Sequence, residues 1–207
     1  MSVAKKVAVI ATSTRTPRVG PHVADLVRST ITKDAAESNI DVFPVAVADF
    51  NLPVFDEKAL PAQVPALAKF EHAHSIAWSN EIAKYDGYVF VIPEYNYGMA
   101  GGTKNAIDYL YNEWIGKPVV IVSYGIGGGN RASEQLQGTL EGMKLRVAGT
   151  RPALAFSGGP GPDFIAAMSK GELGEESRKE WEGKSADILK AFGELKQLLQ
   201  EPPQPNA

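Results

Sequence analysis

The sequence contains no cysteine, and this absence excludes several kinds of chemistry at once. A chain without thiols forms no disulfide, offers no thiolate nucleophile and has no cysteine ligand for a metal. The sequence also has no run near the ~20 apolar residues that a membrane-spanning helix requires. Its net charge of −3 supplies no excess of basic side chains for a nucleic-acid backbone. We therefore expect no membrane span and no nucleic-acid partner.

The chain also has only three histidines. His72 and His74 fall in the stretch 70–84, whose pattern predicts a helix. Two positions apart on a helix, their rings should lie on different faces, whereas a helical metal pair needs a spacing of four. We therefore expect surface histidines and no metal site.

The 207 residues fit one domain, and a hydrophobic fraction of 44% is ordinary for a protein with a real core. We expect a single domain over residues 1–200. The proline-rich stretch 201–207 predicts a flexible C-terminal tail. Residues 1–7 lead into a strand pattern without an apolar signal segment, and this predicts a cytoplasmic location.

Apolar runs of strand length alternate with helical patterns along the whole chain. The five predicted strands cover residues 7–11, 41–47, 89–92, 119–124 and 147–156. Such alternation is typical of a doubly wound α/β fold with a parallel five-stranded sheet and helices on both faces. Pro44 in the second run favours an edge position, because proline has no amide proton for a sheet hydrogen bond.

The loop after the first strand, 12–20, is rich in hydroxyl groups and has two arginines. A helix follows it, and amides at a helix N-terminus attract anions. Its candidate phosphate ligands are Ser13, Thr14, Arg15 and Arg18. The loop has neither G-x-G-x-x-G nor a Walker pattern, so a monophosphate suits it better than a dinucleotide. The alternative is a plain surface connection.

A second loop follows the third strand, where Pro93 should end the sheet pairing. It continues with Glu94, Tyr95, Asn96 and Tyr97, then a glycine-rich gap and a helix. Loops at the carboxyl ends of strands in an open α/β sheet are where ligands bind. The alternative is a strand–helix connection that happens to be aromatic.

A third loop, after the fourth strand, includes Gly125, Gly127 and Gly128. Glycine lets the backbone approach a flat ligand closely and can form an amide-lined concavity. The alternative is a flexible loop without a ligand. If the strand order is 2-1-3-4-5, the first and third strands are neighbours across the switch point, and one ligand can span all three loops.

These loops also carry a resemblance. Ile-Pro-Glu-Tyr-Asn at 92–96, followed by Lys-Asn-Ala-Ile-Asp-Tyr-Leu at 104–110, resembles the signature of the NADPH-dependent FMN reductase family. Members of this flavodoxin-like family include quinone reductases and azoreductases. The stretch 12–15 is similar to the family's Gly-Ser-Thr-Arg phosphate loop, although Thr12 replaces the glycine. Ser-Tyr-Gly at 123–125 and the glycines after it are similar to the element that touches the isoalloxazine.

The resemblance implies an FMN-dependent oxidoreductase. Ser13, Thr14, Arg15 and Arg18 would then hold the FMN phosphate. Pro93, Glu94, Tyr95, Asn96 and Tyr97 would contact the ring, largely through backbone, and Gly125, Gly127 and Gly128 would line its pyrimidine side. NADPH or NADH would donate hydride and a quinone, free flavin, azo compound or metal complex would accept it, in a ping-pong cycle that needs no catalytic side chain.

The resemblance also implies a homodimer or homotetramer. In that assembly Trp114 serves either the partner contact or the core, and Leu52 and Phe55 lie either near the flavin or partner, or simply cover the core. Two other functions remain open. One is a flavodoxin-type electron carrier without substrate turnover of its own, and the other is a flavin-free interaction protein on the same scaffold.

Overall fold

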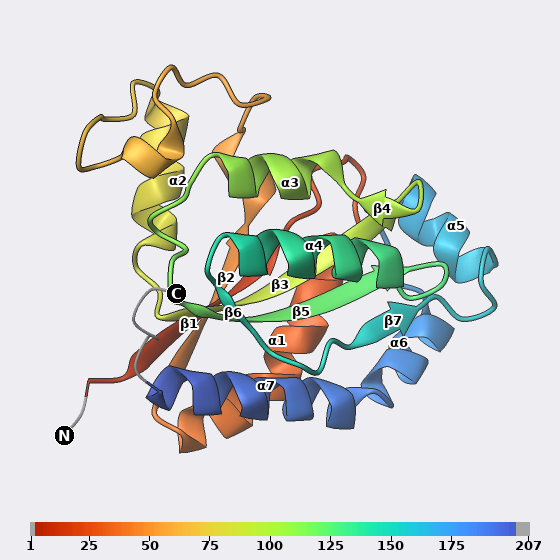
Figure 1. Ribbon diagram of the computed structural model, residues 1–207. Helices are drawn as coiled ribbons and strands as arrows, with labels where there is room; N and C mark the ends of the chain where they lie inside the picture. Colours follow the sequence, from red (N-terminus) through yellow and green to blue (C-terminus); the bar gives the residue numbers. More distant parts are fainter. Residues whose placement is uncertain (1–2, 202–207) are drawn as a thin grey trace.

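The computed structural model describes residues 3–201, in which a parallel sheet lies between two layers of helices (Figure 1). The order β2-β1-β3-β5-β6 forms the sheet, with β7 beside β5 and β4 beside β3. The strands are β1 (Lys5–Ala11), β2 (Ile40–Ala46), β3 (Gly87–Tyr95), β4 (Gly98–Met99), β5 (Pro118–Gly125), β6 (Arg146–Val147) and β7 (Ala153–Ala155). This order confirms the predicted 2-1-3-4-5 arrangement, and β2 is an edge strand as Pro44 indicated.

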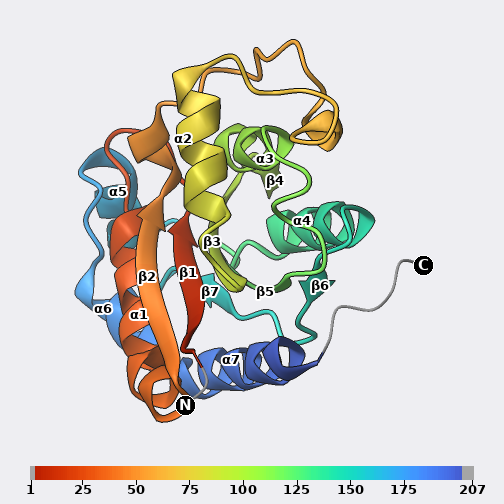
Figure 2. The same ribbon diagram turned by 90° about the vertical axis from the view of Figure 1, so that its left-hand side faces the viewer.

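Helices cover both faces of the sheet (Figure 2). The α-helices are α1 (Gly20–Glu37), α2 (Ala73–Ile82), α3 (Gly101–Asp108), α4 (Asn130–Gly142), α5 (Pro162–Ser169), α6 (Glu175–Glu182) and α7 (Ser185–Gln200). Two short 3-10 helices are η1 (Val47–Phe50) and η2 (Pro61–Gln63). Among the described residues, no helix has the length and apolar character to cross a membrane.

Successive side chains of each central strand enter opposite cores. In β3, Val89 and Val91 pack into the core beneath α1 and α7, whereas Phe90 and Ile92 pack into the core beneath α2, α3 and α4. Both faces are therefore buried, which explains why the strand reads as an uninterrupted apolar run. Trp114 is fully buried in the second core, so within this chain it serves packing.

The predicted fifth strand is in fact two short strands. β6 pairs with the start of β5 and β7 with its end, while residues 149–151 leave the sheet between them. The carboxylate of Glu194 on α7 accepts hydrogen bonds from the amide and hydroxyl of Thr150, and these contacts hold the segment between β6 and β7 against α7. The predicted final helix is also divided, into α6 and α7, and α5 was not predicted.

The predicted placement of the two histidines was wrong. His72 precedes α2 in an extended conformation, and its ring stacks on that of His74 with centroids 5.2 Å apart. His74 lies 3.0 Å from the carboxylate of Asp56. Within residues 3–201 no group of three or more histidine, aspartate or glutamate side chains has an arrangement that could hold a metal ion.

The ammonium of Lys117 lies half-buried just before β5 and donates a hydrogen bond to the Tyr88 hydroxyl at 2.8 Å. Burial lowers the pKa of Lys117 to about 8 from its ordinary 10.5. Above pH 8 the unfolded chain therefore binds more protons here than the folded chain, so stability rises with pH. The range ends near pH 10, where the unfolded tyrosines begin to lose protons.

We expect the free energy of unfolding to rise between pH 8 and 10 by up to about 2 kcal/mol, because of this proton difference. Urea unfolding at a series of pH values measures the slope. Lys117→Met, which cannot titrate, is the matched control and should flatten the profile. A wild-type profile that falls over this range, or that the substitution leaves unchanged, contradicts the expectation.

Candidate functional site

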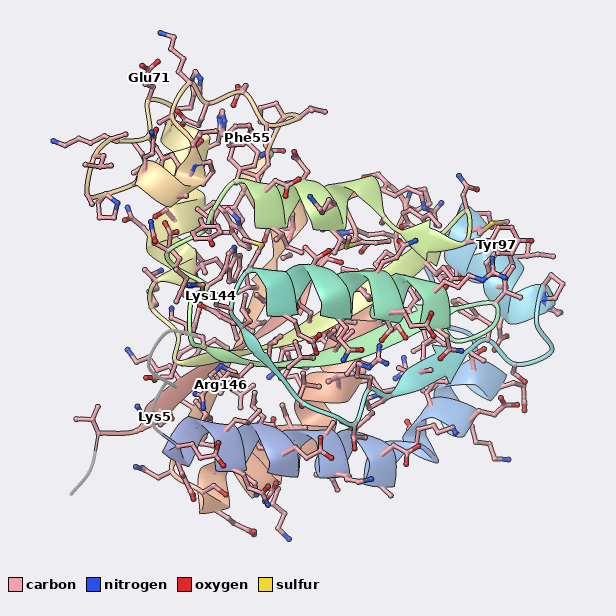
Figure 3. All side chains as sticks on the ribbon, in the orientation of Figure 1. Lys5, Phe55, Glu71, Tyr97, Lys144 and Arg146 are labelled. Atoms are coloured by element: carbon pink, nitrogen blue, oxygen red, sulfur yellow. The ribbon has the colours of Figure 1, made fainter. Side chains whose placement is uncertain are left out.

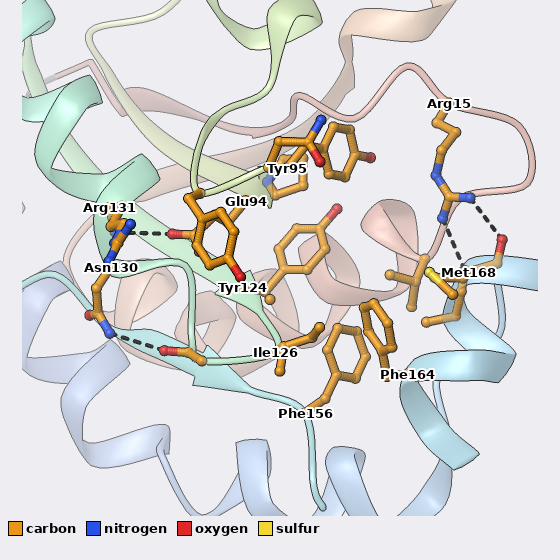
Figure 4. Close-up of a pocket in the computed structure, with 17 residues that line it drawn as sticks. Arg15, Glu94, Tyr95, Tyr124, Ile126, Asn130, Arg131, Phe156, Phe164 and Met168 are labelled. Carbon is orange, nitrogen blue, oxygen red and sulfur yellow. Dashed lines mark hydrogen bonds between the residues drawn. The ribbon is translucent and has the colours of Figure 1, made fainter. Parts of the chain in front are cut away.

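A cavity of about 870 Å³ opens at the carboxyl ends of the central strands (Figure 4). It brings together eight of the residues predicted from the sequence. These are Arg15, Pro93, Glu94, Tyr95, Asn96, Tyr97, Gly125 and Gly127. Ser13, Thr14, Arg18 and Gly128 do not line it. The loops that follow the first, third and fourth predicted strands therefore all contribute residues to this cavity.

The aromatic loop is a tight hairpin rather than an open connection. β3 runs on through Pro93 to Tyr95, which pairs with Gly98 of β4, so Pro93 does not end the strand as predicted. Pairing with β1 has already ended at Val91, and the missing amide of Pro93 costs no sheet hydrogen bond on that side.

Asn96 and Tyr97 form the two-residue turn of this hairpin, with φ of 49° and 62°. Positive φ at both central residues is the requirement of a type I′ turn, and Tyr97 pays a steric cost to adopt it. The turn leaves the Tyr97 side chain 75% exposed at the mouth of the cavity. The guanidinium of Arg131 lies 5.1 Å from the centre of its ring.

The side chain of Glu94 joins the hairpin to α4. Its carboxylate accepts hydrogen bonds from the amides of Arg131 at 3.0 Å and Ala132 at 3.2 Å. These amides lie in the first turn of α4, where they have no partner within the helix, and a negative charge there is favourable. The side chain of Glu94 is thus engaged within the protein, in a residue that also lines the cavity.

The glycine-rich loop after β5 is held tightly. Ser123 donates a hydrogen bond from its hydroxyl to the Gly128 carbonyl at 2.7 Å, and Asn130 donates to the Gly127 carbonyl at 3.0 Å. Gly128 has φ of 87°, and a Cβ there would lie 3.0 Å from the Ala153 Cβ. Gly128 therefore allows packing against β7, whereas Gly125 and Gly127 form the cavity wall.

The loop after β1 presents polar atoms without partners. The hydroxyl of Ser13 and Nε of Arg18 are buried, and neither makes a hydrogen bond of normal geometry with any residue of the described chain. The Tyr124 hydroxyl lies close to Ser13, and burial raises the pKa of Tyr124, which keeps the phenol protonated. Among the described residues, Arg28 Nε and Ser75 Oγ are also buried without a partner, so unpaired donors are not confined to this loop, but Ser13 and Arg18 have donors available to a ligand.

Thr12 and Thr14 face away from the main cavity. The hydroxyl of Thr12 lies 2.7 Å from that of Thr103, fully buried, so the residue that replaces the family glycine adds no ligand to the cavity. Thr14 lines a separate hollow of about 150 Å³ with Leu52 and others. Phe55, near Leu52 in sequence, packs on the Tyr109 ring at 5.2 Å, away from the main cavity.

Arg15 lines the main cavity but is already engaged. Its guanidinium donates hydrogen bonds to the carbonyl oxygens of Met168 at 2.7 Å and Ala167 at 3.3 Å, at the end of α5 (Figure 4). The sequence predicted Arg15 as a phosphate ligand and gave no sign of this helical partner.

Much of the cavity wall was missed because its residues read as ordinary core or loop. The residues that no prediction pointed to are Val19, Phe156, Phe164, Ala167 and Met168, whereas Tyr124, Ile126, Asn130 and Arg131 lie in or beside the predicted glycine-rich loop without having been named as ligands. Phe156 and Phe164 contact each other edge to face at 5.5 Å. No local pattern marks such residues, since their role depends on α5 folding back over the strand ends.

The fold is that of a flavodoxin-like α/β protein, with a cavity at the carboxyl ends of its central strands. The model of one protein family, described as NADPH-dependent FMN reductase, matches residues 5–159. The chain belongs to this family, which confirms the resemblance seen in its sequence. It is therefore grouped with the FMN-dependent oxidoreductases that use NAD(P)H.

Individual relatives agree with this membership. The NAD(P)H-dependent FMN reductase ntnL of Nectria sp is 53% identical over 200 residues, or 95% of this chain and 98% of that protein. The NAD(P)H-dependent FMN reductase C4B3.06c of Schizosaccharomyces pombe is 35% identical over 204 residues, which is 99% of this chain and 95% of that protein. An oxidoreductase structure from Corynebacterium diphtheriae matches with a TM-score of 0.66 at 17% identity, over 97% of this chain and 100% of that one, and shows the shared fold.

The contact between Glu94 and α4 gives a test of the site's construction. We expect Glu94→Ala to lower the free energy of unfolding of the flavin-free protein by about 1–2 kcal/mol, because two amides of the first helical turn lose a charged acceptor. Glu94→Gln retains an acceptor without the charge and should cost less. Denaturant unfolding measures both, and an alanine variant as stable as the wild type would contradict this role.

Proposed function

We propose that this protein binds FMN in the main cavity, takes hydride from NADPH or NADH, and reduces a small acceptor such as a quinone, a free flavin or an azo compound. One observation carries the proposal. The ends of β1, β3 and β5 meet around a single cavity of about 870 Å³, and the loop after β1, which contributes Arg15 to its wall, also contains the unpartnered buried atoms of Ser13 and Arg18. A volume in this range suits a ligand of the size of a mononucleotide.

The chemistry of the phosphate end supports FMN. The hydroxyl of Ser13 and Nε of Arg18 are buried without partners, and both are donors that a phosphate oxygen would accept from. Gly20 begins α1 beside them, and a Cβ there would lie 2.0 Å from Ser13 Oγ. Ser13 and Arg18 would thus hold the phosphate at a helix N-terminus, and Thr14 remains a candidate from the other side of the loop.

The ring end is formed by backbone and flat surfaces. Residues 93–97, with Gly125 and Gly127, line the cavity, and Tyr95 and Tyr97 lie partly exposed. FMN, when bound, supplies the two-electron chemistry, and the protein positions it and limits access of water. The tyrosine faces offer stacking surfaces for a nicotinamide or for a planar acceptor.

Exposed apolar side chains around the mouth support a role for a partner copy. Of the residues that line the cavity, Tyr95, Tyr97, Ile126 and Met168 are each between 37% and 75% exposed. Contiguous exposed apolar surface often marks an interaction site. We include in the proposal a homodimer or homotetramer of single-domain chains (residues 1–200), located in the cytoplasm, where NADPH is available.

The absorbance spectrum and turnover of the purified protein test the proposal. We expect a flavin spectrum in the visible range after reconstitution with FMN, followed by steady NADPH oxidation when a quinone is added. A yellow protein that oxidises no NADPH with any acceptor would instead be an electron carrier of the flavodoxin type. A protein that takes up no FMN would be an interaction protein on the same scaffold, and the proposal would be wrong.

A further inference from the structure

The guanidinium of Arg131 is a positive charge without a partner at an exposed edge of the cavity. Arg131 lines the cavity, and its guanidinium makes no hydrogen bond or ion pair with any residue from 3 to 201. It contacts the Tyr97 ring, 5.1 Å from the ring centre. We propose that Arg131 binds the 2′-phosphate of NADPH and so makes NADPH a better hydride donor than NADH. The inference rests on the proposed function, because it takes a nicotinamide dinucleotide as a substrate of this cavity.

The helix that carries Arg131 does not itself favour an arginine there. Arg131 lies in the first turn of α4, and a positive charge at a helix N-terminus is unfavourable. The carboxylate of Glu94 accepts hydrogen bonds from the backbone amides of Arg131 and Ala132, and in the described part of the chain it forms no ion pair with the guanidinium. Helix stability therefore does not explain the arginine, whereas an anionic ligand does.

The contact with Tyr97 holds the guanidinium and leaves its N–H groups to a ligand. A cation over an aromatic ring is attracted without using a hydrogen-bond donor. Tyr97 itself has φ of 62° at the second central position of the hairpin turn, where glycine is the usual residue. The chain thus accepts a steric cost to place an aromatic ring at the tip of the hairpin, on the surface of the molecule (Figure 3). Backbone strain of this kind is frequent at ligand sites.

The position of Arg131 suits the adenosine half of a dinucleotide. Arg131 and Arg15 lie at opposite ends of the cavity, and Arg15 belongs to the loop proposed to hold the FMN phosphate (Figure 4). The nicotinamide must reach the flavin ring, which would lie against residues 93–97. The adenosine half takes no part in hydride transfer and can extend to the exposed edge. Among the described residues that line the cavity, Glu94 is the one acidic side chain, and the two amides of α4 already compensate its charge.

An arginine at this edge distinguishes two substrates that are otherwise identical. NADPH differs from NADH in a phosphomonoester on the adenosine ribose, and a guanidinium binds such a group through two parallel hydrogen bonds. An arginine near the ribose also accommodates this phosphate in dinucleotide-binding α/β folds. FMN that serves as an acceptor carries a phosphomonoester too, so the experiment has to separate these two sources of the same charge.

Steady-state kinetics with NADPH and with NADH, and with an uncharged quinone as acceptor, test the inference. We expect Arg131→Gln to lower kcat/KM for NADPH about 10-fold, mainly through KM, and to change kcat/KM for NADH less than about 2-fold. Arg131→Lys keeps the charge without the planar fork and should retain part of the preference. In the wild type, KM for NADPH should rise with ionic strength more steeply than KM for NADH, and Arg131→Gln should remove this difference.

Calorimetric titration of the FMN-loaded protein with NADP⁺ and NAD⁺ gives a readout without turnover. In Arg131→Gln the dissociation constant of NADP⁺ should rise by about the same 10-fold factor, and that of NAD⁺ should stay at the wild-type value. Tyr97→Asn suits the positive φ of the turn but removes the ring, so it should reduce the preference for NADP⁺ by a smaller factor.

Equal losses for both dinucleotides would make Arg131 a structural residue or a contact to a partner copy, and would overturn the inference. A wild type without preference for NADPH, or a preference that Arg131→Gln leaves unchanged, would also overturn it. A loss that appears only when FMN replaces riboflavin as acceptor would place the charge at the acceptor instead. Wild-type protein that oxidises neither dinucleotide would contradict the proposed function, which is a different result from any Arg131 outcome.

Discussion

The parallel pairing of β1 with β3, and of β3 with β5, is the constraint on which the site depends. Parallel register places the carboxyl ends of all three strands at one edge of the sheet. Three loops separated by up to about a hundred residues in sequence therefore share one cavity. The chemistry of the site lies in these loops, and the apolar sheet beneath them, buried on both faces, fixes where they meet.

Two charged side chains connect the loops at the strand ends to neighbouring helices, whose positions strand pairing alone does not determine. Glu94 ties the hairpin of β3 and β4 to the start of α4, and Arg15 ties the loop after β1 to the end of α5. Each charge is placed at the helix end whose dipole it complements. Arg15 was predicted as a phosphate ligand and Glu94 as a contact to the ring largely through backbone, and both side chains are engaged within the protein. In the loop after β1, the buried polar atoms without partners belong to Ser13 and Arg18.

The strands and the three loops could be predicted because buried strands are apolar in sequence and turns are rich in glycine and proline. The run at 89–92 is apolar because both of its faces are covered, and Gly125 and Gly128 pack closely against Glu94 and Ala153. The role of Phe164 and Met168 left no such trace, since a helix of eight residues folded over the cavity resembles a surface helix in sequence. The prediction that Pro93 ends the strand was wrong because pairing of β3 with β1 already ends at Val91. The amide that Pro93 lacks therefore costs no hydrogen bond to β1, and this cannot be seen from the sequence around Pro93.

Hydrogen–deuterium exchange of the protein with and without FMN shows most directly whether three strand ends form one site for a single mononucleotide, because it reports on each loop separately. We expect residues 12–18, 93–97 and 125–129 to gain protection together, in the same concentration range of FMN. Protection confined to one loop, or gained at well-separated FMN concentrations, would contradict it.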